Sequence, residues 1–582
     1  MNLKVMDSDD SRFLVFKELN ISSRIRVLVY LTKFSPYKSD GSCTLFIPKY
    51  GIFPEDLDVK GLIERGIPFI FLCRDFTEAY AGIFRPERIF YSTFSYSQRS
   101  ERSITISDDV FYILELLKEP IIIDREALAG FLKFGKVLGG RTLVRGINLL
   151  NAGLILRVDE NGIVLKPGFY YGGQQVALRS REEFEEEFIS VAYEVFKEYV
   201  EAIRRENALV IVPLSAGVDS RFVLSMIHTL GYKKIVTVTY GLKDMEYPVA
   251  KKIAETLGYE NIFVEYTWNL WRRYIESMLN YMVWASQLYL TPNVQEFIST
   301  SEIMYTICSE RSKYCNNAVF VTGDISDVIA GKIPPPTWLS KTSSIKDFVN
   351  FVLETHSLFE PWGVCGDSLV RRTLFSSIEE IKEYLMRSEK RIDFIRMYEI
   401  FHWREGPFKY ISSMRLSHIY YGFKFIAPLW DGRIIQFLSS IPWRFKYKTN
   451  LYKYTLHRHL FKPLGIALED PTKEVSPVRR MLSFVGPLIP ETLVKFYASS
   501  ISRRSRNTGT PRNPCGFDVF FPRMFTLTYI LTNKNLLNSE YEMLTVINSY
   551  LKGVPRDVIA FNSLTCSLLI AKNLCTRKVI SY

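Results

Sequence analysis

Cysteine is scarce in this sequence, and none of its eight cysteines lies in a C-x-x-C pair. Zinc ribbons and dithiol redox sites use that spacing, so the sequence excludes both classes of site. Thiols outside such motifs are typically reduced and buried, and we expect that state here. The cysteines are Cys43, Cys73, Cys308, Cys315, Cys365, Cys515, Cys566 and Cys575.

Long apolar runs are missing as well. No stretch approaches the ~20 consecutive apolar residues of a membrane span. Residues 1–13 (MNLKVMDSDDSRF) are acidic and polar, whereas a signal peptide needs a basic start and an apolar run. We therefore expect a cytoplasmic protein without a membrane partner.

The chain also lacks a strong excess of charge of one sign. The net charge of +12, from 74 Lys and Arg against 62 Asp and Glu, is modest for 582 residues. It does not by itself indicate nucleic acid, and we expect no such partner. The densest basic stretch, 503–506, lies in a segment rich in Ser, Asn, Gly and Pro at 499–516. That segment fits a solvated loop or a phosphate contact, and we expect the loop.

Length and pattern predict three parts. A chain of 582 residues exceeds what one hydrophobic core usually serves. Residues 1–175 contain short β-rich runs at 44–50, 67–73 and 87–96, separated by Gly, Pro, Asp and Ser, which indicates a small sheet domain. We expect a second domain at 176–480 and a helical extension at 481–582.

The second part alternates between helical and strand patterns. An amphipathic helix is expected at 182–205, followed by a buried apolar strand at 208–214 and a helix at 220–231. Strands at 233–241 and 261–266 then flank a helix at 248–258. This order indicates a parallel, doubly wound α/β domain. Long helical patterns follow, and we expect them to pack as helices beyond the sheet.

The loop after the first of these strands carries the side chains best suited to chemistry. It holds Ser215, Gly217, Asp219 and Ser220, at a place where backbone N–H groups and a helix N-terminus converge on an anion. Glycine permits close approach of a phosphate, the hydroxyls can donate to its oxygens, and the carboxylate suits Mg²⁺. A simple Ser/Asp helix cap is the alternative interpretation.

Residues 215–220 resemble the S-G-G-x-D-S signature of the pyrophosphate-loop ATPases, with Ala216 in place of the first Gly. That superfamily includes asparagine synthetases, β-lactam synthetase, lasso-peptide cyclases, NAD and GMP synthetases and several tRNA-modifying ligases. The resemblance implies that the whole loop binds ATP: Ser215, Ala216, Gly217, Val218, Asp219 and Ser220.

Residues 318–332 (AVFVTGDISDVIAGK) resemble the S-G-E-G-x-D-E-x-x-G-G-Y stretch of asparagine synthetases. The resemblance implies that Asp327 holds Mg²⁺ together with Asp219 and that Gly323 contacts the nucleotide. It makes Asp324 a candidate acceptor of the amine's proton, although this side chain is one methylene shorter than the usual Glu.

Residues 415–460 resemble a third stretch of that family, with an Arg, a Gly and a P-x-x-D sequence before K-Y-x-L-R. The family's lysine at the position of Lys453 reaches the α-phosphate, so the resemblance implies a catalytic role for Lys453. Lys473 lies where the family has another lysine before a turn. The matching residues of the stretch are Arg415, Gly422, Pro428, Asp431, Lys453 and Arg458.

Residues 128–162 resemble the strand-rich tail of the family's glutamine amidotransferase domain, which is of the Ntn type. The nucleophile of that domain is an amino-terminal Cys exposed by removal of Met. This sequence begins Met1-Asn2, and its first cysteine is Cys43. We expect a degenerate glutaminase domain that does not hydrolyse glutamine.

Over residues 200–480 the motifs thus resemble asparagine synthetases of class B. The resemblance implies a ligase that uses ATP and Mg²⁺ to adenylate a carboxylate, with aspartate as one candidate, and transfers it to an amine with release of AMP and pyrophosphate. The amine is ammonia, free or from a partner glutaminase, or a different amine, as in β-lactam synthetase and lasso cyclases. A homodimer is one candidate assembly.

Two interpretations from other classes stay open. Ala216 and Val328 depart from the family pattern and fit a nucleotide-binding protein that has lost ligase activity. Retention of Asp219, Asp327 and Lys453 argues against such decay. A tRNA-modifying ligase is the other alternative, and the amidotransferase-like tail and the absence of paired cysteines argue against it.

Overall fold

The computed structural model describes most of the chain up to residue 468. The described residues are 15–22, 25–93, 102–117, 121–172, 180–310, 317–324, 326, 328–333, 335, 339, 344–357, 367–387, 393–446, 449–468 and 570. The helical extension expected at 481–582 lies outside the described residues except for residue 570, so it stays a prediction.

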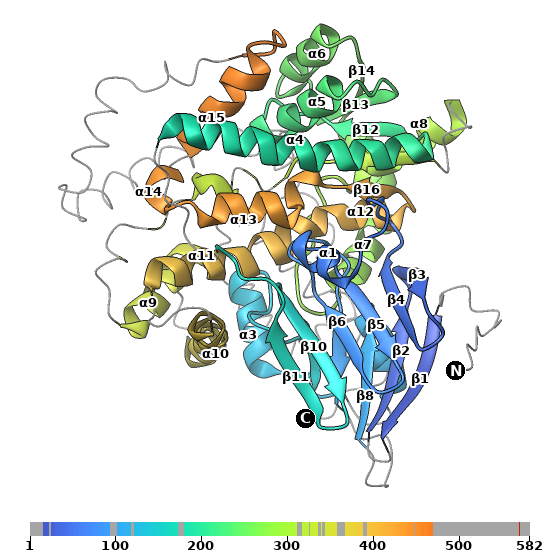
Figure 1. Cartoon of the computed structure of the whole chain (residues 1–582), viewed down its shortest axis with the longest axis vertical. Helices are drawn as coiled ribbons and strands as arrows, with labels where there is room; N and C mark the ends of the chain where they lie inside the picture. The colour runs from blue at the N-terminus through green and yellow to red at the C-terminus, as the bar shows by residue number, and fades with distance from the viewer. Residues whose placement is uncertain are drawn as a thin grey trace.

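Two sheets make up the amino-terminal part, drawn in blue and cyan in Figure 1. The first has the strand order β1-β2-β8-β7-β9 and contains one parallel pair, β2 with β8. The second, of order β11-β10-β6-β5-β4-β3, is antiparallel. The β-rich runs at 44–50 and 67–73 are confirmed as β4 and β5. The run at 87–96 contributes only β7, and residues 94–96 lie outside the described residues.

The elements of this part are mostly strands, with short helices between groups of them. Their bounds are β1 (Val15–Ser22), β2 (Ile25–Leu31), β3 (Phe34–Ser39), β4 (Cys43–Pro48), α1 (Val59–Glu64), β5 (Phe69–Cys73), β6 (Thr77–Tyr80), β7 (Phe90–Ser92), β8 (Arg102–Ser107), α2 (Val110–Leu116), α3 (Arg125–Phe134), β9 (Ile147–Leu149), β10 (Leu154–Asp159) and β11 (Gly162–Pro167).

A third sheet is entirely parallel and has the order β14-β13-β12-β15-β16. Its first strands alternate with helices as expected, so the parallel α/β arrangement is confirmed. The bounds are α4 (Arg181–Glu206), β12 (Leu209–Pro213), α5 (Val218–Thr229), β13 (Ile235–Gly241), α6 (Tyr247–Thr256), β14 (Glu260–Glu265), β15 (Ala318–Val321) and β16 (Lys424–Ile426).

Helices surround this sheet and extend beyond it. Figure 1 shows α4 running across the molecule above α13, and both α5 and α13 pack against it. The remaining bounds are α7 (Trp268–Ser286), α8 (Phe297–Glu310), η2 (Val328–Lys332), α9 (Ile345–His356), α10 (Asp367–Met386), α11 (Phe394–Glu405), η4 (Pro407–Ile411), η5 (Ser412–Arg415), α12 (Leu416–Tyr420), η6 (Pro428–Trp430), α13 (Gly432–Ser440), α14 (Trp443–Lys446), α15 (Asn450–Leu456) and η8 (His457–Phe461).

The sequence of α4 explains why this long helix forms. The Ser180 side chain accepts a hydrogen bond from the Glu183 backbone and caps the first turn. Glu182 and Glu183 lie in that first turn, and basic residues lie in the last one, so both ends complement the helix dipole. Asn207 ends the helix in a left-handed conformation.

Backbone hydrogen bonds join the amino-terminal sheets to the rest of the molecule. The Leu143 amide donates to Leu288 at 2.8 Å, and the Phe425 amide donates to Tyr50 at 2.8 Å. Buried apolar side chains from both parts belong to one continuous core cluster. Since the two parts share a core, they should unfold together rather than as independent units.

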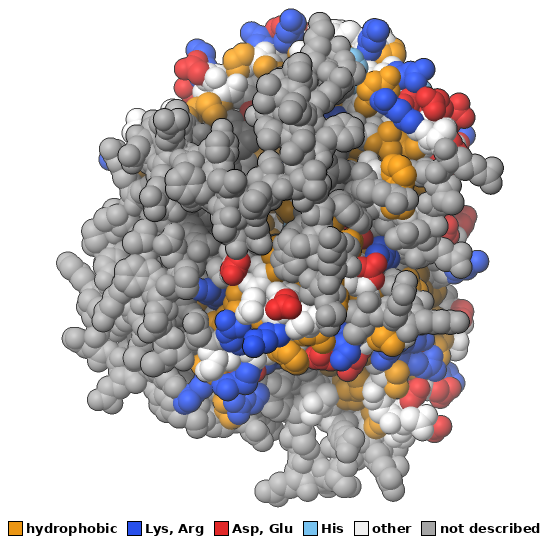
Figure 2. Space-filling view, turned by 90° about the vertical axis from the view of Figure 1, so that its left-hand side faces the viewer, with side chains coloured by type: hydrophobic (Ala, Val, Ile, Leu, Met, Phe, Trp, Pro, Cys, Tyr) orange, Lys and Arg blue, Asp and Glu red, His pale blue; other side chains and the backbone are white. Residues whose placement is uncertain are grey.

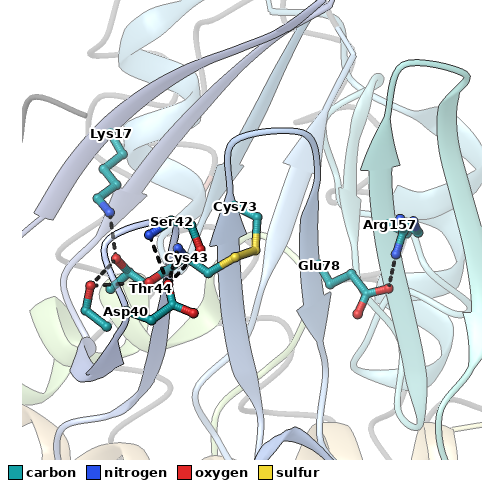
Figure 3. Close-up of a disulfide and its surroundings, with 9 residues drawn as sticks. Lys17, Asp40, Ser42, Cys43, Thr44, Cys73, Glu78 and Arg157 are labelled. Atoms are coloured by element: carbon teal, nitrogen blue, oxygen red, sulfur yellow. Dashed lines mark hydrogen bonds and ion pairs between the residues drawn. A yellow bond between two sulfur atoms is a disulfide. The ribbon is translucent and has the colours of Figure 1, made fainter.

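The state of the cysteines differs from the expected one. Cys43 and Cys73 form a disulfide, because the antiparallel register of β4 and β5 places them directly opposite each other with 4.2 Å between their Cα atoms (Figure 3). Cys308 is disulfide-bonded as well. The expectation of reduced thiols is therefore wrong for these three cysteines. For Cys43 and Cys73 the reason is strand register, which spacing along the chain does not reveal.

Charged and apolar groups alternate on the surface. Figure 2 shows Lys and Arg side chains among Asp, Glu and hydrophobic side chains over the described part of one face. No helix among the described residues is long and apolar enough to cross a bilayer. The cytoplasmic location stays a prediction.

We predict that Cys43→Ser lowers the free energy of unfolding by about 2–4 kcal/mol, because the disulfide restricts a 30-residue separation in the unfolded chain. Urea denaturation with and without reductant measures this. Reductant should lower the midpoint of the wild type by more than that of the variant, because the variant keeps only the disulfide of Cys308. A variant as stable as the oxidised wild type would contradict the prediction.

Two partly buried histidines, His356 and His402, make stability depend on pH. Burial lowers the pKa of His356 to about 3 and that of His402 to about 4. Their rings lie 6.2 Å apart between α9 and α11. The unfolded chain protonates histidine near pH 6.5 while the folded chain resists it, so stability is complete above about pH 6.5 and falls as the pH decreases.

We expect each of these histidines to cost roughly 2 kcal/mol of stability between pH 6.5 and pH 5. Urea midpoints over this range measure the slope. His402→Gln should flatten it, because one depressed pKa is removed, whereas an unchanged slope would show that other groups cause the acid sensitivity.

Candidate functional site

The site expected from the sequence lies at the carboxyl edge of the parallel sheet. β12 pairs with β13 on one side and β15 on the other, so the strand order changes direction at β12. Crevices for ligands form at such points, because the loops of the two neighbouring strands turn to opposite faces. The loop between Pro213 and Val218 opens at this place.

Hydrogen bonds fold the loop tightly onto the start of α5. The Ser215 hydroxyl accepts a bond from the Gly217 amide at 3.0 Å and lies 3.1 Å from the Ser220 hydroxyl. The Ser215 amide donates to Ser220 Oγ at 3.2 Å. Gly217 is the N-cap of α5 and supplies no side-chain cap. The helix therefore does not begin with the Ser/Asp side-chain cap of the alternative interpretation, and its first turn is suited to an external anion.

Two further charged residues support the loop. Arg221 donates to the Gly217 carbonyl at 3.1 Å, and its guanidinium lies over the ring of Phe461 at 4.7 Å. The Glu246 carboxyl is hydrogen-bonded to the backbone of Ala216, and burial raises the pKa of Glu246. Sequence reasoning missed both residues, although Arg221 directly follows the loop.

Gly323 brings the end of β15 against the loop. A Cβ atom on Gly323 would collide with the Asp219 carbonyl and lie 2.9 Å from the Ser220 amide nitrogen. Only glycine fits so close to another backbone. The predicted nucleotide contact Gly323 is thus next to the predicted loop residues, because β12 and β15 are parallel neighbours.

Asp219 is buried and has a partner that the sequence did not indicate. The Tyr452 hydroxyl donates to Asp219 Oδ1 at 2.6 Å, and Tyr452 is 1% exposed. Tyr452 lies on α15 directly before Lys453, so this bond fixes the helix of the predicted catalytic lysine to the loop. The Lys453 side chain is half-buried. Tyr452 and Asp219 are 233 positions apart in the sequence, and no spacing pattern signals a contact between them.

Asp324 belongs to a buried charge cluster. Arg415 Nη2 lies 2.9 Å from Asp324 Oδ2, and Arg415 Nη1 lies 2.8 Å from Glu296 Oε2. The Tyr240 hydroxyl donates to Glu296 at 3.0 Å. Burial raises the pKa of Glu296, and the charge of Arg415 opposes this rise. The fully buried guanidinium thus fixes the carboxylate of Asp324, and a proton reaching that carboxylate competes with this ion pair.

Other matching residues take part in structural contacts. The Asp431 carboxylate caps α13 and forms ion pairs with Arg433 at 2.9 Å and Arg65 at 3.7 Å. Arg458 pairs with Glu185 of α4 at 3.2 Å. These contacts hold α4 and α13 in position rather than line the loop. The predicted metal ligand Asp327 and Lys473 lie outside the described residues.

A comparison with known families agrees with this geometry. Residues 192–464 match the asparagine synthase family. The matched segment begins within α4 and ends just after η8, so it contains the loop, Gly323, Asp324 and Tyr452. The amino-terminal sheets lie outside it. No curated protein matches the chain.

Two solved structures show distant likeness to this chain. The NH3-dependent NAD synthetase from Campylobacter jejuni subsp. jejuni NCTC 11168, in complex with the nitrate ion, is 11% identical, with a TM-score of 0.19, over 40% of this chain and 96% of that chain. A glutamine-dependent NAD(+) synthetase from Cytophaga hutchinsonii is 10% identical, with a TM-score of 0.20, over 64% of this chain and 77% of that chain. Likenesses this distant carry no argument about function.

We predict that Gly323→Ala destabilises the protein by about 1–3 kcal/mol, because the added methyl overpacks the contact between β15 and α5. Chemical denaturation measures the change. Gly61→Ala is the matched control, since its nearest neighbour would be the Asp58 side chain at 3.2 Å within a short helix. Equal stability of the two variants would mean that the contact at Gly323 relaxes freely.

Proposed function

We propose that this protein is an ATP-dependent carbon–nitrogen ligase that adenylates a carboxylate and transfers the acyl group to ammonia or another amine. The observation that carries the proposal is the convergence of three chain segments at the carboxyl edge of β12. The loop 215–220, Gly323 and the Tyr452–Asp219 hydrogen bond come together there within the segment that matches asparagine synthases.

The residues present fit a Mg²⁺ ion bound with the nucleotide. Mg²⁺ in such sites takes one or two carboxylates and completes its shell with phosphate and water. Asp219 of this loop is buried, and the Tyr452 hydroxyl orients one of its carboxylate oxygens. Asp219 and Asp327 would hold the ion, which neutralises charge on the phosphates when bound. The described residues contain no group of three His, Cys, Asp or Glu that could hold a metal without a substrate.

In the first half-reaction an oxygen of the substrate carboxylate attacks the α-phosphorus of ATP. The bond from this phosphorus to the bridging oxygen of the β-phosphate breaks, and pyrophosphate leaves. The loop 215–220 binds the pyrophosphate through its backbone amides and the hydroxyls of Ser215 and Ser220. Lys453 stabilises the negative charge that gathers at the α-phosphate.

In the second half-reaction the amine nitrogen attacks the carbonyl carbon of the acyl-adenylate. The nitrogen gives up a proton, for which Asp324 is the acceptor, and the bond to AMP breaks. Arg415, itself held by Glu296, keeps the Asp324 carboxylate in place, and the proton has to compete with this ion pair. The acid, with aspartate as one candidate, and the amine, with ammonia from a partner glutaminase as one source, belong to the proposal as classes of substrate.

Exchange of labelled pyrophosphate into ATP tests the proposal, because it reports adenylation before the amine is known. With a panel of carboxylic acids we expect exchange that requires one acid and Mg²⁺. Asp219→Asn should lower the rate at least about 100-fold, and Tyr452→Phe about tenfold, because the tyrosine acts only by orienting Asp219.

Asp56→Asn is the matched control, since the Asp56 carboxylate is 95% exposed on the surface of the amino-terminal part. Its exchange rate should equal that of the wild type. A folded protein that binds ATP but shows no exchange with any acid would refute ligation and support a nucleotide-binding protein. Copurified tRNA that is required for exchange would replace the small-molecule substrate with tRNA.

A further inference from the structure

A cleft of about 550 Å³ lies between the amino-terminal sheets and the helices α7 and α12. Figure 1 shows α7 and α12 next to the upper ends of the strands around β4. The segments that line the cleft are the ends of β2 and β4, the start of α2, the second half of α7 and the end of α12. None of its lining residues belongs to the loop 215–220 or to β15. The volume is in the range of sites for small organic molecules.

The wall formed by the amino-terminal part carries two lysines, Lys33 and Lys49, together with the carboxylates of Asp109 and Glu115. Lys33 donates to the Asp108 carbonyl at 2.8 Å and lies 3.6 Å from the Asp109 carboxylate, so its charge is already compensated. Lys49 lies over the ring of Tyr50 at 4.9 Å, and no ion pair joins it to a carboxylate in the described part of the chain. Burial lowers the pKa of Lys49, the nearby Asp108 carboxylate opposes this shift, and the nearby Lys33 adds to it. Lys49 therefore presents a cation whose charge an incoming anion would balance.

The opposite wall is aromatic. Trp284 and Tyr420 meet edge to face, with ring centroids 5.4 Å apart, and Tyr420 is 39% exposed. Lys33 lies over the ring of Trp284, with 5.6 Å between its ammonium nitrogen and the ring centroid, so the two walls of the cleft meet there. Asn280, one turn before Trp284, also lines the cleft, and among the described residues no hydrogen bond involves its amide.

We propose that this cleft binds a small aromatic carboxylate. The carboxylate would pair with the Lys49 ammonium, the ring would lie against Trp284 and Tyr420, and the Asn280 amide would bond a second polar group. The charges lining the cleft favour a ligand with one negative charge over a phosphate, because Asp109 and Glu115 also line the cleft and repel a dianion. The site needs no nucleotide and does not depend on the proposed ligase function.

Calorimetric titration of the full chain with benzoate and phenylacetate tests this proposal, with benzamide and phenyl phosphate as probes of charge. We expect the carboxylates to bind at least about tenfold more tightly than the neutral amide and more tightly than the phosphate. Lys49→Gln should weaken carboxylate binding at least about tenfold and leave benzamide unaffected. Trp284→Leu should weaken both.

Lys60→Gln is the matched control, because Lys60 is an exposed lysine of the same part of the molecule. Its affinity should equal that of the wild type, and thermal midpoints should confirm that all variants are folded. Absence of carboxylate binding, equal binding of benzamide, or undiminished affinity of a folded Lys49→Gln variant would each overturn the proposal. Tighter binding of phenyl phosphate would overturn the assignment to a monoanion.

Discussion

The parallel pairing of β12 with both β13 and β15 is the constraint on which the site depends. Parallel neighbours end at the same edge of a sheet, so the segments that follow them meet there. At this edge the backbones of Gly323 and Asp219 come so close that a side chain on Gly323 would not fit. The segments 215–220 and 322–324 are each a turn that follows a strand. Because their strands are neighbours in the sheet, the two turns lie together and form one site.

The amino-terminal part supports this site mechanically. Arg88, between β6 and β7, donates to the Tyr289 hydroxyl at 2.9 Å and to the Ser412 hydroxyl at 2.5 Å. Both partners follow β14 in the sequence and so belong to the second part of the chain. Lys409 donates to the Val137 carbonyl at 2.7 Å across the same boundary. Buried cations are tolerated only when carbonyls or carboxylates surround them, so these contacts strongly fix the position of η4 and η5. Arg415 ends η5, and its position in turn fixes Asp324.

Local patterns predicted the elements well because they depend on neighbours in sequence. The strand at 208–214 and the helix at 182–205 follow from apolar runs and helical spacing, and the structure has them as β12 and α4. The patterns failed where contacts are distant. Cys43 and Cys73 have ordinary spacing, yet strand register makes them partners. Asp431, matched as a motif residue, is a buried cap and ion-pair partner.

The sequence by itself determined the loop of Ser215 to Ser220, the alternation of strands and helices around it and the resemblance to asparagine synthetases. These properties reside in short segments whose residues act through their own backbone and close neighbours. Only the tertiary structure decided that Tyr452 orients Asp219, that Arg415 holds Asp324, and that lysines of the amino-terminal part and aromatic side chains of α7 and α12 line one cleft. The physical reason is that side chains from different elements meet through packing, and packing is set by the whole core rather than by any one segment.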